Sequence, residues 1–341
     1  MFYKFARKIF FLFNPEFIHD AVINIFGFFT FLHPFFKLIY HTDYKNIVKI
    51  NNLEFNHPLG LAAGLDKDGE AIRFWDTLGF SYIEVGTVTP KPQPGNPKPR
   101  LSRLVKQESL MNRMGFNNKG AEELSENIKK VKPKLKNGIK IGVNIGKNKI
   151  TPNENAADDY IYCLEKLYDN ADYFVINISS PNTEGLRELQ GAEYLDKLLR
   201  SVTEKNKDLA DMKSVQPKEI FLKIAPDLNE NEIKDIFNTA VKFKLTGIVA
   251  TNTTIDKTGL PVNPDEQGGI SGKYLKEKSD NVLKLLNELN AKSEYKLYLT
   301  ASGGVFTKKD YEDKIKLGAT LVQIYTGFIY EGPGILKKIL N

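Results

Sequence analysis

Short apolar runs that alternate with amphipathic segments constrain the fold of this chain more than any other feature. Segments with helical periodicity, such as 156–168, 231–243 and 308–317, separate the runs. Strands joined by helical crossovers run parallel, and eight of them close into a barrel rather than an open sheet. The sequence therefore predicts an α/β fold, a (β/α)8 TIM barrel at 46–341 that begins with a small hairpin at 48–55. The strand-like runs are 59–63, 82–85, 140–144, 173–178, 220–224, 247–251, 297–301 and 321–325.

Composition excludes several classes of site before any motif is considered. The formal net charge is +6 and dispersed, which predicts a solvated surface rather than a nucleic-acid patch, and leaves attraction to anionic lipid or phosphate open. Cys163 is the single cysteine, so no internal disulfide forms and a reducing compartment is expected. All four histidines precede residue 58, which excludes a histidine-based zinc site or a Ser-His-Asp triad in the body of the chain. No metal site is predicted.

The first 40 residues differ from the rest because they are dense in phenylalanine and poor in acids. Phe5, Ile9 and Phe13 recur at helical spacing, and Asn14-Pro15 predicts the start of a second helix. Polar residues at 16, 19 and 20 interrupt the one candidate for a transmembrane span, and no signal-peptide cleavage site follows the first apolar run. We therefore expect residues 1–45 to form an amphipathic helical extension that lies on a membrane surface. The alternative is that these helices pack on the main domain as ordinary core.

Small and polar residues follow every strand-like run, at the end where a barrel of this kind builds its active site. The last two of these loops contain Ser302-Gly303-Gly304 and Tyr325-Thr326-Gly327. Loops after the seventh and eighth strands commonly bind phosphate through backbone N–H groups. The pattern therefore predicts a site for a flavin monophosphate or a sugar phosphate, although solvated turns have a similar composition.

Lysines, amides and one serine are the candidates for chemistry at this face. Lys67 and Lys223 lie at the ends of the first and fifth runs, where an ammonium stabilises negative charge on a bound ring unless these are ordinary surface lysines. Ser180 is the preferred base, with Ser179 barely less favoured, because no histidine is available and Cys163 lies mid-helix. The amides suit a flat heterocycle with alternating donors and acceptors, or else are turn residues. They are Asn112, Asn144, Asn177, Asn182 and Asn252.

Taken together, the loop sequences resemble those of dihydroorotate dehydrogenase, in order and over nearly the whole chain. The segment at 1–40 is similar to the extension of the quinone-dependent class, which the soluble class lacks. One departure is Ala301-Ser302-Gly303-Gly304, where the family usually has a Gly-Val-Gly-Gly-like run. We expect Ser302 to be tolerated or to add a hydrogen bond near the phosphate. The matching segments are LAAGLDKDG (61–69), GTVTPKPQPGNPKPR (86–100), NRMGFN (112–117), NISSPN (177–182), KIAPD (223–227) and ATNTT (250–254).

The resemblance implies oxidation of dihydroorotate to orotate in pyrimidine biosynthesis, with FMN as cofactor and a membrane quinone as final electron acceptor. Ser180 matches the base that removes the C5 proton while hydride passes from C6 to flavin N5. The implied substrate-binding positions are Lys67, Asn112, Arg113, Met114, Gly115, Phe116, Asn177, Asn182, Asn252 and Thr253. The implied FMN-binding positions are Ala63, Gly64, Leu65, Asp66, Lys67, Thr87, Asn144, Asn177, Lys223, Thr251, Gly272, Gly304, Tyr325 and Thr326. His19, Arg103 and Tyr325 match the end of a quinone tunnel.

The resemblance also implies where the protein acts and what it binds. It implies peripheral attachment to the cytoplasmic face of the cell membrane through residues 1–40. Nucleic acid and an obligatory protein partner are not expected.

Three alternatives differ from this assignment in features that the sequence shows. The soluble class of the same family uses fumarate, or NAD through an iron–sulfur partner, and typically has Cys where this chain has Ser180. A flavin-dependent tRNA dihydrouridine synthase needs a catalytic cysteine in an active-site loop and a C-terminal helical domain, whereas Cys163 lies in a predicted helix. In a non-catalytic phosphate-binding barrel at the membrane, Ser180 and Lys67 would have no function.

Overall fold

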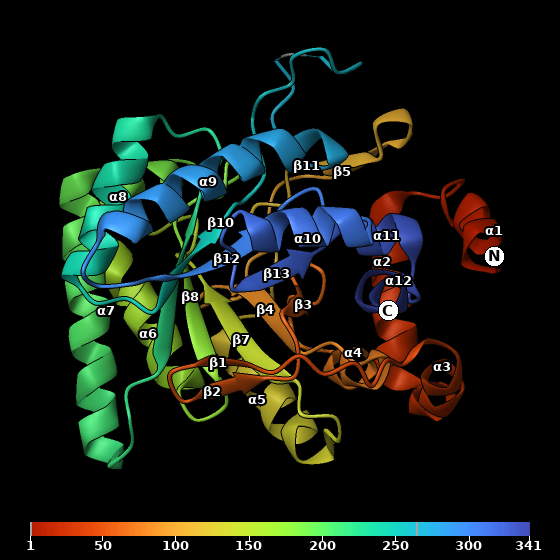
Figure 1. Cartoon of the computed structure of the whole chain (residues 1–341), viewed down its shortest axis with the longest axis horizontal. Coiled ribbons are helices and arrows are strands. Elements are labelled where there is room, and N and C mark those ends of the chain that lie inside the picture. The colour runs from red at the N-terminus through yellow and green to blue at the C-terminus, as the bar shows by residue number, and fades with distance from the viewer. Residues whose placement is uncertain (1, 264) are drawn as a thin grey trace.

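The computed structural model describes residues 2–263 and 265–341, and within them eight parallel strands close into a barrel (Figure 1). Neighbouring strands pair in parallel, and helices surround them, so the predicted (β/α)8 architecture is confirmed. In order around the barrel, the strands are β3 (Leu59–Leu61), β4 (Tyr82–Val88), β7 (Lys140–Ile145), β8 (Tyr173–Asn177), β9 (Glu219–Ile224), β10 (Gly247–Ala250), β12 (Tyr298–Ser302) and β13 (Leu321–Ile324). The surrounding helices are α4 (Ile72–Leu78), α5 (Ala121–Val131), α6 (Ala156–Leu167), α7 (Ala192–Lys213), α8 (Glu230–Lys242), α9 (Lys276–Lys292), α10 (Lys308–Lys316), α11 (Thr326–Glu331) and α12 (Ile335–Leu340).

A short antiparallel hairpin closes the amino end of the barrel. It consists of β1 (Val48–Ile50) and β2 (Leu53–Phe55), where the sequence predicted a hairpin. The Phe55 ring packs edge-on against Tyr82 inside the barrel, with 5.4 Å between the ring centroids. Gly60 makes room for the Tyr82 ring, since a Cβ at this glycine would lie 2.3 Å from a ring carbon. Side chains therefore fill the amino end, which leaves the carboxyl end to form a site.

A separate antiparallel sheet lies beside the carboxyl end of the barrel, and the sequence did not predict it. It consists of β5 (Leu101–Leu104), β6 (Ser109–Asn112) and β11 (Gly269–Gly272). The first two strands follow the proline-dense loop at 91–99 in the connection after β4, and the third comes from the connection after β10. The pairing of Gly269 with Asn112 therefore joins two connections that are far apart in sequence.

The N-terminal helices pack along one side of the barrel, at the right of Figure 1. They are α1 (Phe2–Phe10), α2 (Pro15–Phe28) and α3 (His33–Tyr40). Asn14 caps α2 as predicted, because its side chain accepts hydrogen bonds from the backbone N–H groups of residues 16 and 17. Phe26 of α2 stacks on Phe74 of α4, with 4.0 Å between the ring centroids. One face of the extension is therefore packed as core, in line with the second of the two predicted alternatives.

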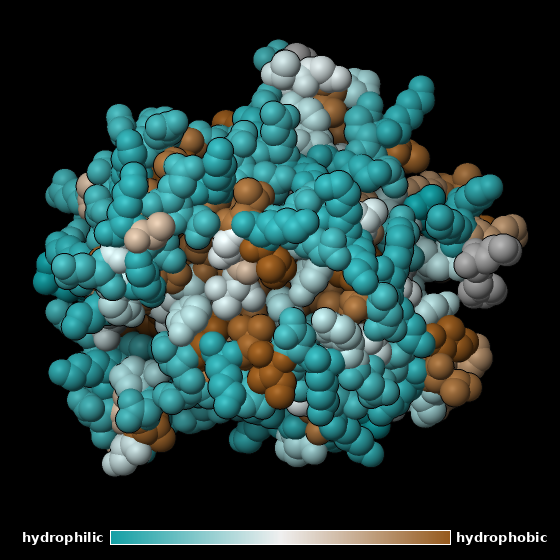
Figure 2. All heavy atoms as spheres, viewed as in Figure 1, coloured by the Kyte–Doolittle hydropathy of each residue, from teal (hydrophilic) through white to brown (hydrophobic). Residues whose placement is uncertain are grey.

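The opposite face of the extension is apolar and exposed. Figure 2 shows brown side chains at the right edge of the molecule, beside the helices α2 and α3, whereas most of this view is teal. No single described helix is long and apolar enough to cross a membrane, although α2 and the segment Thr30–Tyr40, bent by 80° at their junction, meet that test together. The most exposed apolar side chains of this face are those of Phe5, Leu12, Phe17, Phe28, Phe31, Phe35 and Leu38.

Candidate active site

The carboxyl ends of the barrel strands surround a cleft whose empty space, including its open mouth, is about 1020 Å³. The eight strand ends meet there because parallel strands in a barrel all finish at one rim. Most of the residues singled out in the sequence line this cleft. They are Ala63, Gly64, Lys67, Thr87, Asn112, Met114, Gly115, Phe116, Asn177, Ser180, Asn182, Lys223, Thr251, Asn252, Thr253, Gly272, Gly304, Tyr325 and Thr326.

Some of the singled-out side chains lie elsewhere. The carboxylate of Asp66 is buried and accepts hydrogen bonds from the backbone N–H groups of residues 70 and 71 and from Trp75 Nε1, so it fixes the start of α4 instead. Burial raises the pKa of Asp66 to about 6. The Arg113 guanidinium turns outward to the carbonyl of Pro99. Leu65 lines a second cavity rather than the cleft.

Interlocked amides and a hydroxyl form the floor of the cleft. Asn177 Nδ2 donates to Thr87 Oγ1 at 2.8 Å and to Asn144 Oδ1 at 3.0 Å. Thr87 Oγ1 in turn donates to Asn144 Oδ1 at 2.6 Å. Asn144 is therefore a support beneath the lining residues, because its side chain is completely buried and its oxygen is already used twice. These contacts fix the orientation of the Asn177 and Thr87 side chains from below.

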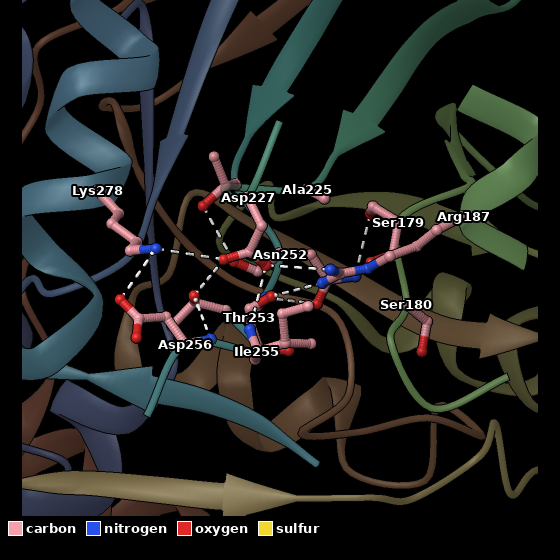
Figure 3. A network of polar contacts seen from close by, with 12 residues as sticks. Ser179, Ser180, Arg187, Ala225, Asp227, Asn252, Thr253, Ile255, Asp256 and Lys278 are labelled. Atoms are coloured by element: carbon pink, nitrogen blue, oxygen red, sulfur yellow. Dashed lines mark hydrogen bonds and ion pairs between the residues drawn. The ribbon is translucent and has the colours of Figure 1, made fainter. Parts of the chain in front are cut away.

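The two adjacent serines have different surroundings, which separates them as candidates for the base. Ser179 is completely buried, and its hydroxyl lies between Asn177 Oδ1 at 3.1 Å and Asn252 Nδ2 at 3.1 Å. Ser180 lines the cleft, and its Oγ accepts a long hydrogen bond of 3.3 Å from the backbone N–H of Asn182. In Figure 3 the Ser180 side chain points away from the polar network that holds Ser179. The geometry therefore favours Ser180 as the hydroxyl that meets a ligand.

A buried carboxylate, Glu84 of β4, lies beneath the cleft and was missed in the sequence. Its Oε2 lies 3.7 Å from Lys223 Nζ and 3.4 Å from Asn144 Nδ2, and its Oε1 accepts from Gln323 Nε2. Glu84 and Lys223 are 1% and 7% exposed, so each charge is balanced by the other inside the barrel. Gln323 was missed as well, although it lines the cleft from β13. Both residues could have been found in the sequence, because each is a charged or amide residue within an apolar strand-like run that a barrel buries.

Lys67 is held in the wall between the cleft and the N-terminal helices. Desolvation lowers the pKa of its ammonium, and the carboxylates of Asp68 and Asp20 act in the opposite direction. Lys67 is half-buried and lines the cleft, so its ammonium is available to a negatively charged ligand group there.

Comparisons with known proteins agree with this arrangement. The family model described as "Dihydroorotate dehydrogenase" matches residues 46–341. The chain belongs to the dihydroorotate dehydrogenase family. A Neisseria meningitidis serogroup A protein named dihydroorotate dehydrogenase (quinone) is 47% identical over 99% of this chain and 98% of its own length. A Vibrio parahaemolyticus protein of the same name is 46% identical over 100% of this chain and 99% of its own. The crystal structure of DHODH from Eimeria tenella in complex with ferulenol superposes with a TM-score of 0.85 and 36% identity, covering 96% of this chain and 89% of that chain.

This member of the dihydroorotate dehydrogenase family also has a second, largely apolar cavity between the N-terminal helices and the barrel. Its empty space, including its opening, is about 1890 Å³. Tyr325 lines both this cavity and the cleft, so it lies where the two approach each other. Arg103 and His19 line it too, and Arg103 Nη1 donates to the carbonyl of Phe13 at 2.7 Å. Other lining residues include Tyr3, Ala6, Phe10, Phe11, Ile18, Ala21, Val22, Ile25, Phe35, Phe36, Leu65, Phe74 and Phe328.

His19 should stay neutral at ordinary pH. Desolvation lowers its pKa to about 3, and the Lys67 ammonium acts in the same direction. The unfolded value is about 6.5, so between these values the unfolded chain binds a proton that the folded protein does not. His19 therefore reduces the free energy of unfolding as pH falls from about 6.5 toward 3. We expect His19→Gln to lose less stability than the wild type between about pH 7 and about pH 5, measured by urea unfolding. Equal losses would contradict a His19 side chain that stays neutral in the folded protein.

Proposed function

We propose that this protein oxidises dihydroorotate to orotate in the cleft at the carboxyl end of the barrel, with FMN as bound cofactor and a membrane quinone as final electron acceptor. The observation that carries the proposal is the convergence of Ser180, Lys67, Lys223 and the amide side chains on one rim. The near full-length similarity to proteins named dihydroorotate dehydrogenase (quinone) supports the same conclusion.

The cleft has features that fit a flavin mononucleotide. Gly272, Gly303 and Gly304 have φ angles of +96°, +130° and +74°, and a Cβ at Gly304 would lie 2.4 Å from Lys276 Cβ. Glycine at these positions exposes backbone N–H groups, which are suitable donors to a phosphate. Gln323 Oε1 is buried and has no hydrogen-bond partner among the described residues, a cost of about 1–3 kcal/mol that a ligand N–H would relieve. Ser302 lines the same cradle, and its carbonyl accepts from Ser279 Oγ at 2.9 Å.

Different residues of the chain would serve different parts of the dehydrogenation. Bound FMN would supply the acceptor for the hydride that leaves C6 of dihydroorotate. Ser180 Oγ would take the proton from C5 while its own hydroxyl proton passes to a neighbouring hydroxyl or an ordered water, and the hydrogen bond from the Asn182 N–H would stabilise the negative charge that develops on Oγ during this exchange. Lys67 would hold the substrate carboxylate, because its ammonium is a positive charge in the lining of the cleft.

The amide side chains would orient the flat ring of the substrate. Asn182 Nδ2 donates to Asn112 Oδ1 at 3.1 Å, and Asn252 Nδ2 donates to Ser179 Oγ at 3.1 Å. These contacts hold amides from three different loops in fixed orientations. Thr253 and the segment 112–116 complete the proposed substrate site, with Arg113 contributing through its backbone because its side chain turns outward.

The second cavity would admit the quinone. Its apolar lining suits a lipid-soluble molecule, and Tyr325 would mark the place where the quinone approaches the cofactor. The exposed apolar face of α1, α2 and α3 would lie on the cytoplasmic surface of the cell membrane and bring the opening of the cavity to the lipid. We further propose residues 1–45 as the membrane-associating segment and 46–341 as the catalytic barrel, a division supported by the family match that begins at residue 46.

The structure also bears on the alternatives. Cys163 of α6 is completely buried, and burial raises the pKa of its thiol well above the usual value. A thiol in that position cannot reach a ligand in the cleft, which argues against a dihydrouridine synthase. Ser180 rather than cysteine in the cleft argues against the soluble class of the family.

The visible spectrum of the purified protein tests the proposed function. We expect a yellow protein that bleaches when dihydroorotate is added without oxygen and recovers its colour when a quinone is added. Recovery with fumarate or NAD but not with quinone would indicate the soluble class instead. A colourless protein that does not take up FMN would refute the proposal.

A further inference from the structure

One guanidinium joins three of the loops that surround the proposed substrate site. Arg187 lies in a short 3₁₀ helix, Leu186–Gln190, in the connection after β8. Its Nε donates to the carbonyl of Ser179 at 3.2 Å, and its Nη2 donates to the carbonyl of Thr253 at 3.1 Å. Its Nη1 forms an ion pair of 3.0 Å with Asp227, which follows β9 (Figure 3). The loops after β8, β9 and β10 therefore meet at one side chain.

Asp227 is the counterpart that fixes the guanidinium. Its carboxylate is 13% exposed and accepts from the backbone N–H of Ile255 at 3.1 Å and from the hydroxyl of Thr254. Lys278 of α9 lies 3.5 Å from the same carboxylate and 3.1 Å from Asp256, which adds a helix to the network. With this many partners, the carboxylate has little freedom to move, and neither has the arginine bound to it.

The two carbonyl groups that Arg187 binds belong to residues that are adjacent in sequence to residues proposed to contact the substrate. Ser179 directly precedes Ser180, and Thr253 directly follows Asn252. Arg187 itself is not among the described residues that line the cleft. Gln190 of the same 3₁₀ helix adds a second attachment, because its Oε1 accepts from the backbone N–H of Ala225 at 3.0 Å.

We infer that Arg187, fixed by Asp227, is a positioning residue that sets Ser180 and Asn252 at the distance and angle that proton abstraction needs. The inference rests on the proposed function. A planar guanidinium donates in three directions at once, and a lysine ammonium at the end of a flexible stem does not reproduce this fork. Displacement of a reacting group by about 1 Å costs up to ~100-fold in rate, so loosening of the loops should be visible in the substrate step.

Rapid mixing of the FMN-loaded protein with dihydroorotate, and of the reduced protein with quinone, separates the two half-reactions. We expect Arg187→Ala to slow reduction by dihydroorotate by about 10- to 100-fold, while oxidation by quinone stays within about twofold of the wild type. Spectral titration with orotate, which needs no turnover, should show weaker binding. Arg187→Lys should be slow as well, because it keeps the charge but loses the fork. Arg200→Ala is the matched control, since Arg200 of α7 pairs with Asp196 on the surface, and it should behave as the wild type.

If Arg187→Ala does not fold, Asp227→Asn tests the same inference, because Asp227 is the ion-pair partner of Arg187. It should slow reduction in the same way, and the double variant should be no slower than the slower single variant. Reduction at the wild-type rate in Arg187→Ala or Asp227→Asn, full recovery in Arg187→Lys, or equal slowing of both half-reactions would each overturn the inference. Wild-type protein that dihydroorotate does not reduce would instead show that the proposed function is wrong.

Discussion

Ser180→Ala is expected to retain FMN but to be reduced by dihydroorotate at least ~100-fold more slowly than the wild type, the low end of the contribution of a general base. The variant should fold and bind the cofactor, because the Ser180 hydroxyl makes one long hydrogen bond to the backbone N–H of Asn182. Stopped-flow measurement of flavin bleaching without oxygen gives the rate directly. Oxidation of the chemically reduced variant by quinone should be unchanged, since Ser180 lines the cleft and not the second cavity.

Ser179→Ala is the informative companion. It removes a hydroxyl that lies between Asn177 and Asn252, so it should loosen two amides and slow reduction less than the loss of the base. A Ser179→Ala variant that is slower than Ser180→Ala would move the proposed base to Ser179. Unchanged bleaching in Ser180→Ala would remove Ser180 from the chemistry altogether.

The sequence was sufficient to predict that Lys67, Lys223 and Ser180 line the same cleft, for a geometric reason. Each follows or ends a different strand-like run, and parallel strands in a closed barrel finish at the same rim. The rule places residues on a face without any knowledge of side-chain contacts. It does not distinguish a residue that lines the cleft from one that lies beneath it, such as Asn144, or from one that holds the turn before a helix, such as Asp66.

The features that were missed depend on pairing between distant segments. The sheet of β5, β6 and β11 consists of four-residue strands from two different connections, too short for a clear alternation of apolar and polar residues. Arg187 lies in a polar loop, and nothing local to that loop indicates that Asp227 and Thr253 lie within its reach. Glu84 points into the barrel only because of the register of β4, which the sequence alone does not fix.

The two predicted alternatives for the N-terminal helices, a membrane-surface face and core packing on the barrel, apply to different faces of the same helices. Phe26 and Phe36 are packed against Phe74, while Phe28 and Leu38 are 81% and 83% exposed. A helix that covers a cavity on one side and has an apolar surface on the other meets both descriptions. The sequence pattern alone could not assign each stripe to its environment, because both stripes are apolar.

Removal of residues 1–40 is expected to abolish turnover with a long-chain quinone while leaving reduction by dihydroorotate in place. The lining of the cleft begins at Ala62, so the truncation leaves the proposed substrate and FMN sites in the chain. It removes one wall of the second cavity together with the exposed apolar face. It also takes Glu16 away from buried Arg100, with which it forms a 2.8 Å ion pair, so some loss of stability is expected. Stopped-flow bleaching and steady-state assays with long-chain and short, water-soluble quinones separate these effects.

Val22→Trp in the full-length chain tests the same cavity without disturbing that ion pair. Val22 lines the second cavity from α2, and an indole there would fill part of the space proposed for the quinone. We expect oxidation of the reduced protein by a long-chain quinone to be at least ~10-fold slower, a loss of about 1.4 kcal/mol in transition-state stabilisation, with reduction by dihydroorotate unchanged. Met212→Trp, at an 81% exposed position on α7, controls for the added indole. Normal long-chain quinone turnover in both the truncated protein and Val22→Trp would show that electrons leave the flavin by a route that does not involve the N-terminal helices.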